Sequence, residues 1–267
     1  MALNGERLVT IAVGALAATI LCILYSPVVI GALFSVIEVT RSGIDWSSFS
    51  LEWYAKLWQN QSILDAVRST LIVSICSVAI AVVLSIVLAL YVEWEGAIGR
   101  RLIELVVYLP FLLPPIVTGL SLLIFFSNLG INRGIATVAI GHTVFVLAVL
   151  YRLVLTRLQS LPPTLVEASA DLGATRWQTL RYVLWPQLRS AVATGAILAF
   201  TLSFDETLIS VFLAGDTTTL PLRLWAMMRV GFTPEINALV TLVLLFSIVL
   251  AVIVSTRMKP TGEVEDE

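Results

Sequence analysis

Long runs of apolar residues constrain this chain more than any other feature of its sequence. Six stretches reach the roughly 20 mainly apolar residues that an α-helix needs to cross a lipid bilayer. Of the 267 residues, 58% are hydrophobic and only 13% are charged, which leaves too few polar side chains to cover a water-soluble globule. We therefore predict an all-α integral membrane protein with six transmembrane helices, at about residues 8–37, 66–92, 102–126, 135–155, 188–213 and 236–256.

The distribution of positive charge indicates how these helices are oriented. If the amino terminus lies in the cytoplasm, ten of the 16 Lys and Arg residues fall on that side and six on the other. Cytoplasmic loops carry an excess of Lys and Arg, so both termini are expected in the cytoplasm. The first apolar run is too long for the core of a signal peptide and predicts an uncleaved helix. Residues 260–267 are expected to form a disordered acidic cytoplasmic tail.

Two of the predicted outer loops have a distinctive composition. Residues 38–65 carry several aromatic side chains, which favour either a belt at the membrane surface or a docking surface for an extracytoplasmic partner. Residues 215–235 contain leucines and methionines spaced as in an amphipathic segment, which predicts a helix lying at the outer surface and ending near Gly231 and Pro234.

Three prolines interrupt the third apolar run. Pro110, Pro114 and Pro115 each lack a backbone N–H and clash with the preceding helical turn, so a kink or a break is expected. A membrane tolerates a broken helix where the freed carbonyl groups are buried in protein or face water. Pro114 is therefore a candidate for the lining of a translocation pathway, and a kink that only shapes packing is the alternative.

His142 is the only histidine of the chain, and it lies in the fourth apolar run. A single histidine in such a helix indicates either a hydrogen bond to a neighbouring helix or a proton relay. No second titratable group stands at helical spacing from it, which favours the hydrogen bond.

The fifth apolar run contains two adjacent acids, Asp205 and Glu206, in the sequence TLSFDET. A carboxylate at bilayer depth costs about 2.5–3.5 kcal/mol, so such residues normally face a cavity or the interior of a bundle. Asp205 stands 17 residues after Leu188, which at 1.5 Å per residue places it about 25 Å along the helix, in the outer half of the membrane. Thr201 lies one turn below it. The acids either attract a cationic solute or pair with an arginine such as Arg223 or Arg229.

A polar segment, residues 157–187, separates the fourth and fifth apolar runs. Thr164 with Glu167, and Thr175 with Gln178, have the spacing of two capping boxes, and these predict two short helices. Gly173 suits the left-handed conformation that closes a helix, and Pro186 is expected to end the second one. The sequence thus predicts a compact helical corner at the inner surface.

This corner resembles the EAA loop of the inner-membrane permeases of binding-protein-dependent ABC importers. The family pattern is E-A-A, three residues, G, nine residues and I-x-L-P. The residues at the defined positions of this pattern include Glu167, Ala168, Ser169, Gly173, Val183 and Pro186. The chain departs from the pattern at Ser169, at Val183 and at Trp185, whose larger side chain can reshape the wall against which it packs. The resemblance implies that the corner is the coupling helix that docks on a cytoplasmic ATPase.

Further stretches are similar to one branch of this family, the C-type permeases of spermidine/putrescine importers. They are SFDETLISVFLAG, TLPLRLW and GFTPEINAL. The resemblance implies a bacterial inner-membrane complex of this permease with a second homologous permease, two ATPase subunits and a periplasmic solute-binding protein. It also implies a polyamine or related cationic amine as the solute, which agrees with two carboxylates in the membrane.

The chain shows none of the common motifs for nucleotide, zinc or serine-hydrolase chemistry. We therefore expect no enzyme activity and no cofactor, with ATP used only by a partner chain, and no nucleic-acid partner. Other aminated solutes, such as amino-phosphonates or opine-like amines, stay open as substrates. An ion-coupled secondary carrier and a membrane scaffold without a transport path are the alternatives from other classes.

Overall fold

The computed structural model describes residues 2–40, 43–93, 96–230 and 234–257. The predicted acidic tail lies outside these residues. The chain divides into two compact units, residues 1–61 with 226–248 and residues 62–225 with 249–267.

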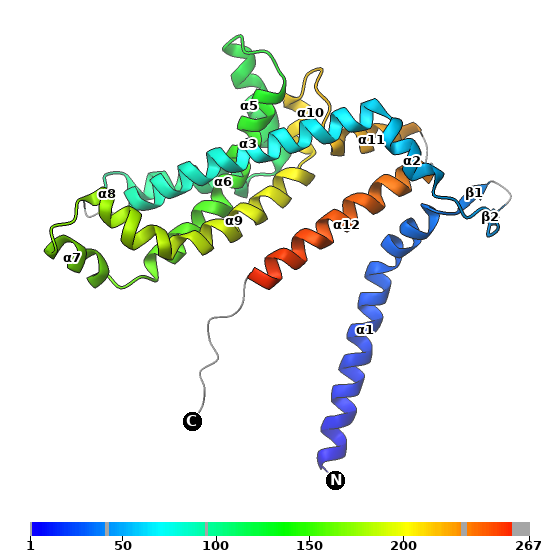
Figure 1. Cartoon of the computed structure of the whole chain (residues 1–267), viewed down its shortest axis with the longest axis horizontal. Coiled ribbons are helices and arrows are strands. Elements are labelled where there is room, and N and C mark those ends of the chain that lie inside the picture. Colours follow the sequence, from blue (N-terminus) through cyan, green and yellow to red (C-terminus); the bar gives the residue numbers. More distant parts are fainter. Residues whose placement is uncertain (1, 41–42, 94–95, 231–233, 258–267) are drawn as a thin grey trace. The chain divides into compact units, whose positions relative to one another are not determined.

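The first unit consists of helices and one small hairpin (Figure 1). Strands β1 and β2 pair antiparallel, with Val39 opposite Ile44. The Ser35 hydroxyl lies 2.7 Å from the Tyr54 hydroxyl, and the Asn60 amide donates to Glu235 Oε1 at 3.0 Å. The aromatic segment within residues 38–65 is therefore folded, and side-chain hydrogen bonds tie it to neighbouring helices. The elements are α1 (Ala2–Phe34), β1 (Glu38–Thr40), β2 (Gly43–Asp45), α2 (Glu52–Gln59) and part of α12 (Pro234–Arg257).

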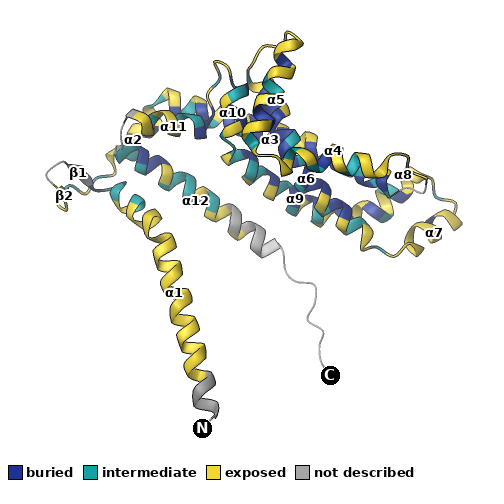
Figure 2. Ribbon diagram, turned by 180° about the vertical axis from the view of Figure 1, so that it is seen from behind, coloured by how far each residue is buried: buried dark blue, intermediate teal, exposed yellow. Residues whose placement is uncertain are grey.

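The second unit holds the bundle that carries both candidate sites. Its elements are α3 (Gln61–Val92), α4 (Arg100–Leu112), α5 (Pro115–Asn128), α6 (Ile135–Gln159), α7 (Thr164–Asp171), α8 (Arg176–Gln178), the π-helix η1 (Thr179–Leu184), α9 (Trp185–Asp205), α10 (Leu208–Leu213) and the first part, 220–225, of α11 (Leu220–Val230). Helix α6 packs along α9 and against α4, so it lies at the centre of the bundle. Helices α7 and α8 lie at one end of this unit, away from α5 and α10 (Figures 1 and 2).

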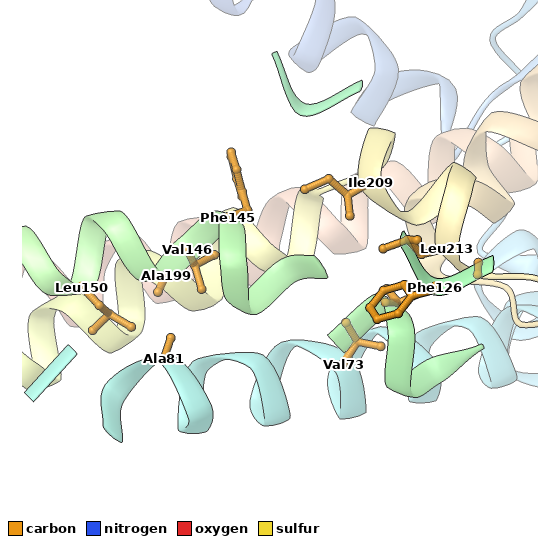
Figure 3. Packing of buried hydrophobic residues seen from close by; sticks show 11 residues of the cluster. Val73, Ala81, Phe126, Phe145, Val146, Leu150, Ala199, Ile209 and Leu213 are labelled. Carbon is orange, nitrogen blue, oxygen red and sulfur yellow. The ribbon is translucent and has the colours of Figure 1, made fainter. Parts of the chain in front are cut away.

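Two apolar clusters form the core of the bundle. One joins α3, α5, α6, α9 and α10 through residues such as Val73, Val146 and Ile209 (Figure 3). The other joins α3, α4, α6 and α9 through residues such as Tyr151 and Leu188. Figure 2 shows that α1, in contrast, is exposed over residues 7–30. That exposed surface is apolar, as the lipid-embedded helix predicted from the sequence requires.

Within the described residues, four helical segments are long and apolar enough to cross a membrane. A fifth is obtained if the bent pair α4 and α5 is one span. A further apolar stretch, Pro234–Val249, lies in α12. The fold class is therefore that of a multi-pass helical membrane protein, and the count of six spans stays a prediction. The four segments are Arg7–Phe34, Gln61–Val92, Ile135–Gln159 and Arg176–Asp205.

The third predicted helix is broken, as its prolines indicated. Helices α4 and α5 meet at an angle of 111°. Pro114 stands at the amino-terminal cap of α5 and Pro115 is its first residue, where a missing N–H costs nothing. Pro110 stays inside α4, and its carbonyl oxygen accepts a hydrogen bond from the Thr118 hydroxyl at 3.3 Å. The Thr118 side chain thus supplies a hydrogen-bond donor to a backbone carbonyl group beside the break.

The fifth predicted helix, expected to be continuous over 188–213, is also broken, and here the prediction was wrong. Helix α9 ends at Asp205, Glu206 is extended, and α10 starts at Leu208. The amphipathic segment predicted within 215–235 is present as α11, although it ends at Val230 and Pro234 instead begins α12.

Candidate functional site

The polar corner consists of α7, α8 and η1, and its first helix closes as the sequence predicted. Gly173 has φ +76°, the left-handed conformation. The Gly173 N–H donates to the Ala170 oxygen at 2.8 Å, and the Ala174 N–H donates to the Ser169 oxygen at 3.1 Å. These two bonds are the Schellman pattern, which satisfies the last carbonyl groups of a helix and turns the chain sharply.

Only one of the two predicted capping boxes forms. Thr175 caps α8, with its hydroxyl accepting from Gln178 N and its own N–H donating to Gln178 Oε1. Thr164, in contrast, is already the first residue of α7. The backbone oxygens of Pro162 and Pro163 accept the first N–H groups of that helix, so no threonine cap is needed.

Pro186 does not end the second helix of the corner, contrary to the prediction. It stands in the first turn of α9, directly after the π-helix η1. The wider π turn bonds the Trp185 N–H to the Leu180 oxygen, five residues back. Pro186 is the second residue of α9, and the corner passes without interruption into the membrane helix.

One surface of the corner is a shallow hollow. Four of the six predicted coupling residues line it. Around it, Leu172, Trp177 and Tyr182 are 89%, 67% and 71% exposed. These three side chains give the corner an exposed apolar surface. The lining residues are Leu165, Ala168, Ser169, Leu172, Gly173, Ala174, Gln178, Tyr182 and Val183.

Glu167 and Pro186, the other two predicted coupling residues, do not line the hollow. Both are exposed, Glu167 in the first turn of α7 and Pro186 in the first turn of α9. The structure adds one contact that the motif did not suggest. The hydroxyl of Ser169 in α7 lies 2.7 Å from that of Thr179 in η1, and both side chains are buried.

The second candidate site is the break between α9 and α10. Asp205 and Thr201 are exposed on α9, one turn apart, as expected. The ion pairs among the described residues include neither Asp205 nor Glu206, so the alternative in which one of these acids pairs with an arginine such as Arg223 is not supported. Pro114 is exposed at the α4–α5 break.

His142 makes the hydrogen bonds that the sequence favoured. Its Nδ1 lies 2.9 Å from the Ser203 hydroxyl in α9, and its Nε2 lies 2.9 Å from the Ser210 hydroxyl in α10. The ring is 2% exposed. Sequence reasoning could not name its partners, because serine is common in membrane helices and nothing distinguishes these two. In the described part of the chain, no cluster of three His, Cys, Asp or Glu residues could hold a metal.

Apolar spans, broken helices and a capped polar corner define this molecule as a multi-pass helical membrane component. Residues 81–259 match the family described as "Binding-protein-dependent transport system inner membrane component". The match covers more than half of the sequence, and the chain belongs to this family of transport-system inner-membrane components.

Curated relatives support the same assignment. The chain is 33% identical over 230 residues to "Spermidine/putrescine transport system permease protein PotC" of Escherichia coli (strain K12), which covers 86% of this chain and 87% of that protein. It is 32% identical to "Putrescine transport system permease protein PotI" of the same organism, over 83% and 81% of the two chains.

The fold is shared with solved transporters. A bacterial ABC transporter involved in the import of the acidic polysaccharide alginate aligns with a TM-score of 0.76 at 16% identity, covering 96% of this chain and 98% of that one. A chain of the MetNI methionine ABC transporter aligns with a TM-score of 0.59, covering 79% of this chain. At these identities the likeness concerns the fold alone.

Proposed function

We propose that this chain is one of two homologous permease subunits in an ATP-driven importer of polyamines or related cationic amines. The observation that carries the solute class is Asp205, an exposed carboxylate in a membrane segment without an arginine partner among the described residues. Such a group favours a cation over an anion. The names of the relatives PotC and PotI support the same class.

The energy for import comes from partner chains in this proposal. Two ATPase subunits bind the corner from the cytoplasm, and a periplasmic solute-binding protein delivers the amine to the outer side. Exposed apolar groups around the hollow support docking at Leu172, Trp177 and Tyr182. The positive-inside count supports placing both termini and the corner in the cytoplasm.

Transport follows alternating access. Closure of the ATPase pair moves the corner, and η1 transmits the movement to α9 because the two form one continuous helical run. Asp205 stands at the far end of α9. Movement at the corner therefore reaches the candidate solute site without a flexible joint between them.

The decisive experiment measures ATPase activity in proteoliposomes that contain the complete importer with its binding protein. We expect spermidine or putrescine to stimulate ATP hydrolysis, and 2-aminoethylphosphonate and opines to stimulate it less. Stimulation by one of those solutes alone would replace the polyamine assignment. Uptake that follows the membrane potential without any ATPase subunit would instead indicate an ion-coupled carrier.

A substitution at Gly173 tests the corner. Valine is disfavoured at φ +76° by roughly 1–2 kcal/mol, whereas asparagine tolerates this conformation, so Gly173→Asn is the matched control. No atom lies within 4 Å of an added Cβ, so the effect is conformational rather than steric. We expect Gly173→Val to assemble into the complex but to hydrolyse ATP without uptake. Normal uptake by this variant would contradict the proposed lever.

A further inference from the structure

Asp205 and Glu206 are adjacent, but their carboxylates have different surroundings. Asp205 is exposed, and its side chain accepts no hydrogen bond from the part of the chain that the structure describes. Glu206 Oε1 accepts a hydrogen bond from the Ile209 N–H at 3.0 Å. The Glu206 carboxylate therefore caps the first turn of α10, and the Asp205 carboxylate is free.

A hydrogen-bonded chain of side chains crosses the break beside these acids. Ser203 in the last turn of α9 lies 3.3 Å from Ser74 of α3 and 2.9 Å from His142 of α6. His142 continues to Ser210 in α10, whose hydroxyl donates to the Glu206 backbone oxygen at 3.1 Å. All four side chains are at most 2% exposed. The single proton of the Ser210 hydroxyl goes to the Glu206 backbone oxygen, so this hydroxyl accepts from Nε2 of His142.

This arrangement solves a specific problem of a broken helix. A break in a membrane leaves backbone N–H and C=O groups without helical partners, and lipid offers no replacement. Here the Glu206 carboxylate accepts a hydrogen bond from a backbone N–H of α10. The Ser210 hydroxyl donates a hydrogen bond to the Glu206 backbone oxygen. His142 holds α9 and α10 to the same point of α6. The direction of the Asp205 carboxylate depends on this assembly, since Asp205 is the last residue before the break.

We propose that the two acids divide their work: Asp205 contacts the cationic solute, while Glu206 and His142 are positioning residues that hold the break. The first half rests on the proposed function, because it needs a cationic solute. The second half concerns the fold of the break and holds whatever the solute is.

The first experiment compares three variants of the complete importer by spermidine-stimulated ATPase activity. Glu206→Gln keeps an acceptor oxygen without the charge, Glu206→Leu removes both, and Asp205→Asn removes the charge of the other acid. We expect Asp205→Asn to raise the half-maximal spermidine concentration about tenfold or more. We expect Glu206→Gln to restore the response that Glu206→Leu loses. A loss in Glu206→Gln as large as in Asp205→Asn would overturn the division.

The second experiment needs no solute and measures thermal unfolding of the purified complex in detergent. We expect Glu206→Leu and His142→Phe to lower the midpoint, and Glu206→Gln and Asp205→Asn to leave it near that of the unmodified protein. Adding Ser210→Ala to His142→Phe should lower the midpoint less than Ser210→Ala does in the unmodified protein. The reason is that His142→Phe has already removed the hydrogen bond between His142 and Ser210. An unchanged midpoint in Glu206→Leu and His142→Phe would refute the positioning role.

The two experiments separate the claims. If no amine stimulates the unmodified complex, the proposed function fails, and the unfolding series still decides whether Glu206 and His142 hold the break. If amines stimulate the unmodified complex but the Glu206→Gln variant loses this response as Asp205→Asn does, the proposed function stands. The proposed division of work between the two acids is then wrong.

Discussion

Ser169 shows how one residue can change the rigidity of the corner. It stands where the E-A-A pattern has alanine, and its hydroxyl joins α7 to η1 through Thr179. Thr179 also donates to the Thr175 oxygen at 3.3 Å, so it links three parts of the corner. A corner that must transmit force gains from such a link, because α7 then moves with the helix that enters the membrane.

We predict that Ser169→Ala lowers the free energy of local unfolding at the corner by about 1 kcal/mol, since a buried hydrogen bond is lost. Hydrogen exchange of the Gly173 and Ala174 amides measures this change. Ser190→Ala is the control, because Ser190 is exposed on α9. Equal exchange rates in both variants would show that the Ser169–Thr179 contact contributes nothing.

Sequence reasoning succeeded at residues whose role is set by their own chemistry. Gly173 was predicted because few other residues adopt positive φ, and Thr175 because its capping partner stands three residues away. It failed at Thr164, where proline carbonyls accept the N–H groups that a threonine cap would take. At Glu206 it did not foresee that the side chain accepts a backbone N–H. Those outcomes depend on competition between groups, which spacing alone does not reveal.

At the scale of helices, the break before α10 escaped prediction because residues 208–213 are as apolar as the helix before them. What identifies α10 is its packing. An added Cβ at Gly119 of α5 would lie 3.1 Å from Ile209 Cα and 2.9 Å from Phe212 Cδ2. An added Cβ at Gly141 of α6 would lie 2.6 Å from Leu213 Cδ1. Two glycines on different helices thus make room for this short helix.

We predict that Gly119→Ala destabilises the protein by about 1–3 kcal/mol, because the added methyl group meets the backbone of α10, which cannot rotate away. Gly141→Ala should cost less, since it meets the ends of side chains. Gly14→Ala is the control, with no atom of this chain within 4 Å. Thermal unfolding in detergent measures all three. An unchanged unfolding temperature in Gly119→Ala would mean that α10 does not pack against α5 as described.

For the whole molecule, the number of spans decides which side of the membrane holds the corner. Each crossing reverses the side, so the bent pair α4 and α5 fixes the placement of everything after it. If the pair crosses, the loop after α5 lies outside and the corner after α6 lies inside. If the pair returns to its own side, the loop lies inside and the corner lies outside, out of reach of any ATPase.

Single cysteines distinguish these topologies. Cys22 and Cys76 are exposed in this chain, so both are first replaced by alanine. Ser47→Cys, Asn132→Cys and Thr164→Cys then place one thiol each at an exposed position in the first outer loop, after α5 and in the corner. The positive-inside count predicts that a membrane-impermeant maleimide labels the first two in intact cells. It should label Thr164→Cys only after the membrane is permeabilised.

The Asn132→Cys result decides between the two topologies. Once Ser47→Cys has shown that the first loop lies outside, labelling of Asn132→Cys reports whether the bent pair crosses the membrane. Labelling from outside makes α4 and α5 one span and places the corner beside the cytoplasmic ATPase. Protection of Asn132→Cys together with outside labelling of Thr164→Cys would make the pair re-entrant. In that case an ATP-driven lever at Gly173 is impossible, however well the corner matches the family pattern.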